Sequence, residues 1–204
     1  KRGSTTTGGF DGTLPFNNTS GAHTAYPGTG TLQLLGGGSH TGTFTTTGNV
    51  QLGGGTHTFN DGSSIVGNTT LHLAAGILRV PTGATATVTG TLEWDGQSTI
   101  FGQGGAQGTL KVAAGASLNL SGTGTRQLNN VTLSNEGTVR YNSAGNDLVI
   151  VNNAIFDNAA SGTFDIQNNI FARTAIAPGT FNNFGTVLKS AGAPSAGFAA
   201  GGGV

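Results

Sequence analysis

Residues 121–141 read SGTGTRQLNNVTLSNEGTVRY, and within them short apolar segments alternate with polar turns. The segment contains no helix-length amphipathic face. Its apolar residues recur at strand spacing, and we expect four of them to point inward: Leu128, Val131, Leu133 and Val139. Asn129-Asn130 and Asn135-Glu136-Gly137 are expected corners, since Asn and Gly accept turn conformations readily. The segment is therefore interpreted as one repeat of a larger array.

The same pattern recurs along the chain as a small or polar residue, usually Thr, followed by an apolar one. The apolar members are Leu32, Val50, Leu71, Leu92, Leu110 and Val131, at spacings of 18, 21, 21, 18 and 21 residues. Short alternating segments around them, such as Leu71-His72-Leu73, are typical of strands with one buried face. A repeat of about 20 residues that cannot bury its own apolar face is the unit of a solenoid. The sequence predicts an all-β, parallel β-helix (β-solenoid) of eight or nine coils, with about 18–25 residues per coil.

If the coils stack with these repeats in line, the recurring apolar residues are buried between them. We expect ten positions to form the core of the stack: Leu32, Val50, Leu71, Leu92, Leu110, Leu118, Val131, Val139, Ile166 and Val187.

Three segments carry a resemblance to a known group of proteins. They are GTLKVAAGASLNLSGTGTRQLNNVTLSNEGTVRYNSAG, AIFDNAASGTFDIQNN and GTFNNFGTVLKSAG. They resemble the Gly/Asn/Thr-rich β-helical repeats of large bacterial secreted or cell-surface proteins, including adhesin-like and autotransporter-like stalks. The resemblance covers roughly residues 30–192. It implies a right-handed coil, an extracellular or cell-surface location and a structural or adhesive role.

Composition excludes several classes of function. Gly accounts for 38 of 204 residues, and only 8% of residues are charged, against about 25% in ordinary domains. Eight basic and eight acidic residues balance, with no basic stripe for a phosphate backbone, so we expect no nucleic-acid partner. No apolar run approaches the length of a membrane span, and there is no Cys for a thiolate site. There is also no Met, so we expect the first residue to arise by cleavage or excision.

Three regions are expected. Residues 1–29 are the least regular and predict an N-terminal arm or cap. Residues 30–192 predict the β-solenoid. Residues 193–204 are rich in Ala and Gly and predict a flexible C-terminal segment.

The four histidines offer a candidate metal site. They are His23, His40, His57 and His72, spaced 17, 17 and 15 residues apart, close to one coil. No carboxylate accompanies them at a fixed offset. We therefore interpret them as stacked or surface polar residues, and expect no metal and no cofactor.

One cluster could carry carbohydrate chemistry. Glu93 and Asp95 flank Trp94, and alternate residues of a strand point to the same side. Two carboxyl groups about 5–9 Å apart are what glycoside hydrolysis needs, and an exposed indole could stack on a sugar ring. The competing interpretation is an ordinary Asp-Gly turn beside a core Trp94. An exposed Trp94 beside both carboxylates would favour the carbohydrate site, and a buried Trp94 would favour a smooth rod.

Weighing these, the sequence favours a non-enzymatic structural protein. We expect a rigid extracellular rod in a surface fibre, filament or adhesin stalk, whose partners are copies of itself or further coils of the same polypeptide. The alternative is a carbohydrate-binding or polysaccharide-cleaving β-helix module that contacts surface glycans through Glu93, Trp94 and Asp95.

Overall fold

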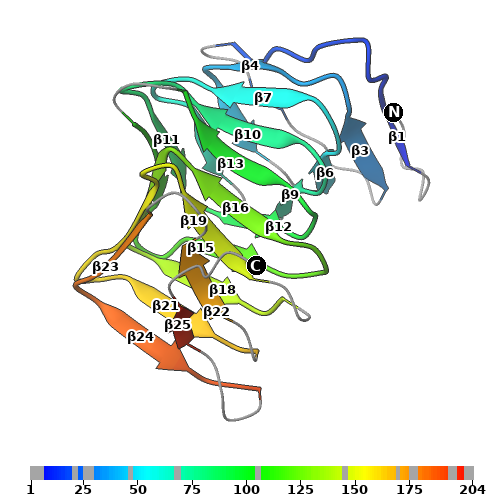
Figure 1. Cartoon of the computed structure of the whole chain (residues 1–204). Coiled ribbons are helices and arrows are strands. Elements are labelled where there is room, and N and C mark those ends of the chain that lie inside the picture. The colour runs from blue at the N-terminus through cyan, green and yellow to red at the C-terminus, as the bar shows by residue number, and fades with distance from the viewer. Residues whose placement is uncertain are drawn as a thin grey trace.

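A computed structural model describes residues 7–19, 23–24, 30–45, 48–66, 70–103, 107–143, 147–168, 171–174, 179–192 and 197–199. Within these residues the chain forms an all-β parallel solenoid of about seven turns, with about 23 residues per coil. Each coil contributes one strand to each of three parallel sheets, called A, B and C. Figure 1 shows the coils stacked in chain order, from blue at the N-terminal end to red at the C-terminal end.

The strands are short, with turns at the corners of each coil. Sheet A contains β1 (Gly8–Phe10), β3 (Thr31–Leu34), β6 (Asn49–Leu52), β9 (Thr70–Leu73), β12 (Thr91–Trp94), β15 (Ser117–Leu120), β18 (Thr138–Tyr141), β21 (Thr163–Ile166) and β24 (Thr186–Lys189). Sheet B contains β4 (Gly38–His40), β7 (Thr56–Phe59), β10 (Ile77–Val80), β13 (Thr99–Gly102), β16 (Arg126–Asn129), β19 (Leu148–Val151), β22 (Phe171–Thr174) and β25 (Gly197–Ala199). Sheet C contains β2 (His23–Thr24), β5 (Thr43–Thr45), β8 (Ser64–Val66), β11 (Thr85–Val88), β14 (Gly108–Val112), β17 (Val131–Asn135), β20 (Ile155–Asn158) and β23 (Thr180–Asn183).

The core is a set of columns that run from coil to coil inside the solenoid. One column on sheet A consists of Leu32, Val50, Leu71, Leu92, Leu118, Val139, Phe164 and Val187. Each member pairs with the residue at the same place in the next coil, so a single apolar side chain is covered on both sides by others of its kind. The alternation of buried and partly exposed residues along β9, β12 and β15 confirms the predicted strand pattern.

The predicted register was wrong after Leu92. The residue that pairs with Leu92 is Leu118, whereas Leu110 lies in sheet C between Ala86 and Leu133. The recurring Thr-Leu pair therefore lies in sheet A at Leu92 and in sheet C at Leu110. The two positions look alike in the sequence because strands of both sheets begin with the same residue types. The expected eight or nine coils become about seven for the same reason.

Eight of the ten expected core residues are buried. Leu32 is only partly buried but packs against the core. Val187 is 39% exposed, because it lies in β24, the last strand of sheet A within the described residues. An inward residue in a terminal strand has a covering coil on one side only.

A ladder of asparagines occupies one inward column of sheet C. Asn135, Asn158 and Asn183 follow one another in successive coils. Nδ2 of Asn135 donates to Oδ1 of Asn158 at 2.8 Å, and Nδ2 of Asn158 donates to Oδ1 of Asn183 at 2.7 Å. The same amides also donate to the carbonyls of Thr163 and Thr186, where the chain turns into sheet A. Asn135 was expected at a corner, and its amide satisfies backbone groups there from inside the coil.

Candidate functional site

The outer face of sheet A carries a row of polar side chains that runs from β3 to β21. One outward position is occupied in successive coils by Gln33, Gln51, His72, Glu93, Asn119, Arg140 and Asp165. The step between consecutive members varies from 18 to 26 residues. The sequence analysis did not identify this row. The coils differ in length, so residues that lie side by side in the sheet are not evenly spaced in the sequence. The signal that could have found it was a polar residue between two apolar ones in each sheet A strand from β3 to β21.

Asp95 turns toward the preceding coil. Its Oδ2 atom lies 2.6 Å from Nδ1 of His72, and both side chains are about one-third exposed or less. The hydrogen bond to Asp95 raises the pKa of His72, against the effect of burial, and the charges of Asp95 and Glu93 act in the same direction. The two residues form an ion pair between adjacent coils when the imidazole is protonated.

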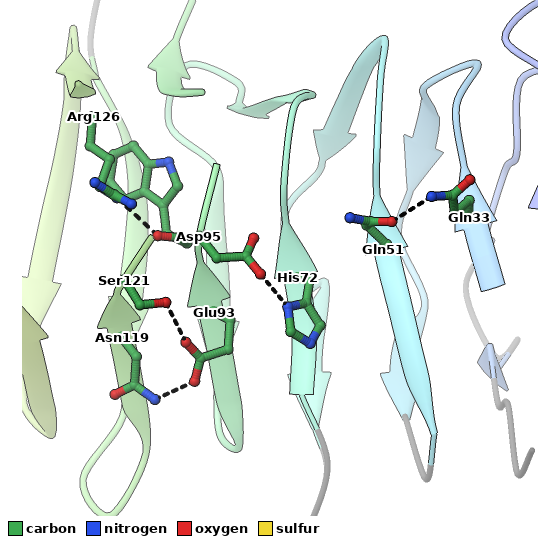
Figure 2. Close-up of polar contacts among 9 residues, drawn as sticks. Gln33, Gln51, His72, Glu93, Asp95, Asn119, Ser121 and Arg126 are labelled. Carbon is green, nitrogen blue, oxygen red and sulfur yellow. Dashed lines mark hydrogen bonds and ion pairs between the residues drawn. The ribbon is translucent and has the colours of Figure 1, made fainter. Parts of the chain in front are cut away.

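Glu93 turns toward the following coil. Its Oε1 atom accepts a hydrogen bond from Nδ2 of Asn119 at 2.5 Å, and its Oε2 atom accepts one from Oγ of Ser121 at 3.3 Å. Figure 2 shows the two carboxylates pointing in opposite directions along the stack, with Asp95 toward His72 and Glu93 toward Asn119 and Ser121. A pair of carboxylates that act on one glycosidic bond must face a common point. The observed arrangement connects coils instead.

Trp94 lies inside the solenoid and is fully buried. Its Nε1 atom donates to Oγ of Ser98 at 2.6 Å, which satisfies the one polar atom of the indole. On sheet A it pairs with Leu120, so it occupies a core column. The indole cannot stack on a sugar without leaving that column, and this placement agrees with the smooth-rod interpretation.

A buried arginine fixes the corner beside Trp94. Arg126 begins β16, and its Nε atom donates to the carbonyl of Trp94 at 2.9 Å. Its Nη1 atom donates to the carbonyl of Gly124 and to Oγ of Ser143. Burial lowers the pKa of Arg126, although nearby Tyr141 and Asp95 act in the opposite direction. Within the described part of the chain Nη2 has no hydrogen-bond partner.

Two shallow hollows flank the Glu93 and Asp95 position. One, of about 250 Å³, is lined by Glu93, Asn119, Leu120, Ser121, Arg140, Asn142 and Gln167. The other, of about 190 Å³, is lined by Thr31, Asn49, Gln51, His72 and Asp95. Most of the residues that line them have polar side chains, and the first hollow combines carboxylate, amide, hydroxyl and guanidinium groups.

The histidines do not come together as one site. His40 and His57 are buried in sheet B, His72 lies on the outer face of sheet A, and the side chain of His23 lies outside the described residues. Nowhere in the described ranges do three His, Asp or Glu residues form a group that could hold a metal ion. His40 and His57 contact each other, and His72 contacts Asp95.

Comparison with known proteins gives no relative: no family model, no curated protein and no solved structure matches the chain. Among the described residues, no helix is long and apolar enough to cross a membrane.

Proposed function

We propose that the chain is a structural, non-catalytic protein that forms a rigid rod in an extracellular fibre, filament or adhesin stalk at the cell surface. The observation that carries this proposal is the outer face of sheet A. Its polar side chains bond to neighbouring coils, as Gln33 does to Gln51, His72 to Asp95 and Asn119 to Glu93. Such contacts stiffen a stack along its length, whereas a catalytic site needs groups that converge.

The proposed partners are copies of the chain or further coils of the same polypeptide. β1 and β24 are the edge strands of sheet A within the described residues, and a parallel edge strand offers unpaired backbone groups to a further strand. Phe184, Leu188 and Phe198 near the C-terminal end are 71%, 44% and 50% exposed. Coils in a solenoid gain stability from their neighbours, so an open end favours continued stacking.

Two measurements test this proposal. Negative-stain electron microscopy with sedimentation velocity on the purified chain should show rods that lengthen with concentration. Protease treatment of intact cells that make the protein should remove it while sparing a cytosolic marker. Compact particles of constant size, or a protein protected until the cells are lysed, would contradict the proposal.

A second candidate is a glycan-binding face, which the hollow lined by Glu93, Arg140 and Gln167 favours. Its side chains offer both donors and acceptors, the groups that a sugar's hydroxyls require. Arg140 donates to Oγ of Ser117 at 2.9 Å, so its guanidinium is held over the hollow by a neighbouring strand. In this candidate the face binds a surface glycan without cleaving it.

Titration calorimetry with neutral and acidic oligosaccharides tests the glycan candidate. Binding that weakens on Arg140→Gln, but not on the matched control Lys111→Gln, would support the hollow as the site. Lys111 is a suitable control because it lies on sheet C and pairs with Glu136 at 2.8 Å. Equal affinity in both variants would place any binding elsewhere.

A further inference from the structure

The charges in the row along the outer face of sheet A are arranged about a neutral centre. Asn119 lies in β15, with Glu93 one coil before it and Arg140 one coil after it. His72 lies two coils before Asn119, and Asp165 lies two coils after it. Each acidic residue of the row therefore has a basic residue at the same number of coils on the other side of Asn119.

The two inner charged side chains both reach toward the central strand. Nδ2 of Asn119 donates to Oε1 of Glu93 at 2.5 Å, and Nη1 of Arg140 donates to Oδ1 of Asn119 at 3.4 Å. Figure 2 shows Glu93 turned toward Asn119 in this way. Glu93 and Arg140 are both partly exposed, so one negative and one positive group flank β15 on the outer face.

A two-fold axis through Asn119 makes this pattern complementary to itself. The axis lies between two facing copies of sheet A and parallel to their strands, so the two solenoids run antiparallel. Each position of the row then faces the position on the other side of Asn119 in the second copy, as in any isologous contact. We propose that two copies of this chain associate side by side and antiparallel through the outer faces of sheet A, with Glu93 of each copy paired to Arg140 of the other.

The outer charges of the row support the same arrangement. His72 faces Asp165 of the second copy, and the hydrogen bond to Asp95 raises the pKa of His72, which favours its cation. Asp165 is only 7% exposed, so it acts on His72 through its charge and makes no direct contact. Arg140 also approaches the Asp95 side of β12, which adds a second carboxylate near the guanidinium.

Other alignments of the two rows place like charges against each other. An axis centred on Glu93 or on Arg140 brings that residue against its own copy. An axis half a coil toward β12 sets His72 against Arg140, and one half a coil toward β18 sets Glu93 against Asp165. A parallel, in-register pair sets every charge level with its own copy. Because like charges that face each other across an interface cost free energy, the row selects the alignment centred on Asn119.

The rest of the face allows the two sheets to approach. Within the described strands, the adjacent outward column from Thr31 to Thr186 consists of Thr, Ser and Asn. These short side chains leave room for the longer ones of the row. Leu188 follows Asp165 in the next coil and is 44% exposed. It falls opposite Gln51 of the second copy, so the pairing covers an exposed apolar side chain.

The size of the face sets the expected affinity. At about 4.8 Å per strand, the strands from β6 to β24 span roughly 30 Å, and each strand is about 13 Å long. The contact therefore covers about 800 Å² over the two copies, less than the roughly 1,200–2,000 Å² of stable interfaces. We expect one pair of chains to associate weakly. In a rod built of many copies, each copy would add one such contact, and the weak contacts would act together.

Charge reversal tests the pairing. Glu93→Arg sets two pairs of like charges in the interface, and so does Arg140→Glu. Each variant alone should associate at least about tenfold more weakly than the unmodified chain in sedimentation equilibrium, a change of about 1.4 kcal/mol. An equimolar mixture of the two variants should recover association, because opposite charges then meet in both pairs. The double variant should recover it for the same reason. Lys111→Glu, on sheet C, is the control that should associate like the unmodified chain.

Crosslinking tests the direction of the two copies. The chain has no Cys, so a single introduced Cys is unique. Ser121 lies two residues after Asn119, close to the proposed axis, and Ser121→Cys should form a covalent dimer with a bismaleimide about 10 Å long, the separation of facing sheets. Gln33→Cys should not, because the position opposite it lies beyond β24, the last strand of sheet A within the described residues. A parallel, in-register pair would reverse the two results and contradict the inference.

This inference rests on the proposal that copies of the chain are partners, and deepens it, and the outcomes separate the two. Rods that lengthen with concentration while neither charge reversal weakens side-by-side association would overturn the lateral contact and leave the rod in place. Dimers that crosslink through Ser121→Cys but never lengthen would support the lateral contact and contradict the rod.

Two further outcomes would overturn the lateral contact. One is loss of association in both single variants without recovery in their mixture or in the double variant. The other is an unmodified chain that stays monomeric at millimolar concentration and binds oligosaccharides through Arg140, which would assign the face to a glycan. Circular dichroism of each variant checks that the fold is kept.

Discussion

The ring of His40 is stacked on the ring of His57 inside the solenoid, with centroids 5.3 Å apart and planes inclined by 15°. Nε2 of His40 lies 3.1 Å from Nδ1 of His57, and Nε2 of His57 lies 3.3 Å from the carbonyl of Leu34. Because a carbonyl only accepts, Nε2 of His57 carries a proton, and its Nδ1 accepts from His40. Phe44 and Phe59 contact the ring of His40, so the pair is neutral in an aromatic environment.

Acid should therefore weaken the fold through this pair. Burial, and then the neighbouring ring of His57, lower the pKa of His40 to about 3, and burial lowers the pKa of His57. An unfolded histidine, with a pKa near 6.5, binds more protons than the folded one between pH 3 and pH 6.5, so stability falls as pH falls through that range. For His40 alone the loss between pH 7 and pH 5 should be about 2 kcal/mol.

Urea unfolding at pH 7 and pH 5 measures this loss. In the His40→Phe variant the difference between the two pH values should shrink by about 2 kcal/mol, the part that His40 contributes. His72→Gln is the matched control: the pKa of His72 is raised, so its contribution is present below pH 6.5 and declines as pH rises through the folded pKa. An acid loss that is unchanged in His40→Phe would show that other groups cause it.

Leu110 tests the core. It is fully buried between Ala86 and Leu133 on sheet C. Truncation to Ala should lower the free energy of unfolding by roughly 2–5 kcal/mol, and Leu110→Asp should cost more, because it buries an unpaired charge. Val187→Asp is the control in a terminal strand and should cost much less, since Val187 is 39% exposed. Similar melting temperatures for the two Asp variants would contradict the observed register.

The asparagine ladder makes a separate prediction. Asn158 is fully buried and bonds to Asn135, to Asn183 and to the carbonyl of Thr186. Asn158→Ala should cost roughly 2–4 kcal/mol, because each buried polar partner left unpaired costs about 1–3 kcal/mol. Asn182→Ala, on the outer face of sheet C, should cost under about 1 kcal/mol. Chemical denaturation of both variants measures the two costs. Equal losses of unfolding free energy would show that the ladder stabilises the fold no more than a surface contact does.

Close approach of two coils at Gly96 predicts intolerance to any side chain. A Cβ atom at Gly96 would overlap the carbonyl of Ala74 in the preceding coil. Gly96→Ala should therefore push the coils apart and destabilise by about 1–3 kcal/mol. Gly12→Ala is the control, because its nearest neighbour, Leu35, is in ordinary contact at 4.0 Å. A thermal melt of Gly96→Ala that matches that of Gly12→Ala would show that the backbone relaxes without cost.

Sequence predicted the parallel solenoid and most of its core because burial imposes a two-residue alternation that survives in each strand. It did not predict which sheet a strand joins. Thr91-Leu92 and Thr109-Leu110 look alike, yet the first lies in sheet A and the second in sheet C. The corner segments between strands differ in length, and that length decides which residues become neighbours.

The sequence predicted which residues make up the candidate site, but it did not predict the directions in which their side chains point. Alternation placed Glu93 and Asp95 on the same side of a strand, and the sequence left Trp94 open to either interpretation. Only the neighbouring coils determine that Glu93 faces Asn119 and that Asp95 faces His72. Side-chain direction in a solenoid depends on residues about one coil away, and sequence adjacency does not contain that information.

Within the described residues, each strand pairs with its counterparts one coil before and one coil after, and this also sets how the solenoid responds to a pull on its ends. Neighbouring coils are separated by about 4.8 Å along the axis, whereas the roughly 23 residues of one coil, drawn straight, reach about 75–80 Å. A pull on the two ends should break the hydrogen bonds between coils one coil at a time. Each coil that unfolds should lengthen the chain many-fold at that point, while the remaining coils stay folded. We therefore expect the solenoid to extend coil by coil when it is pulled along its axis.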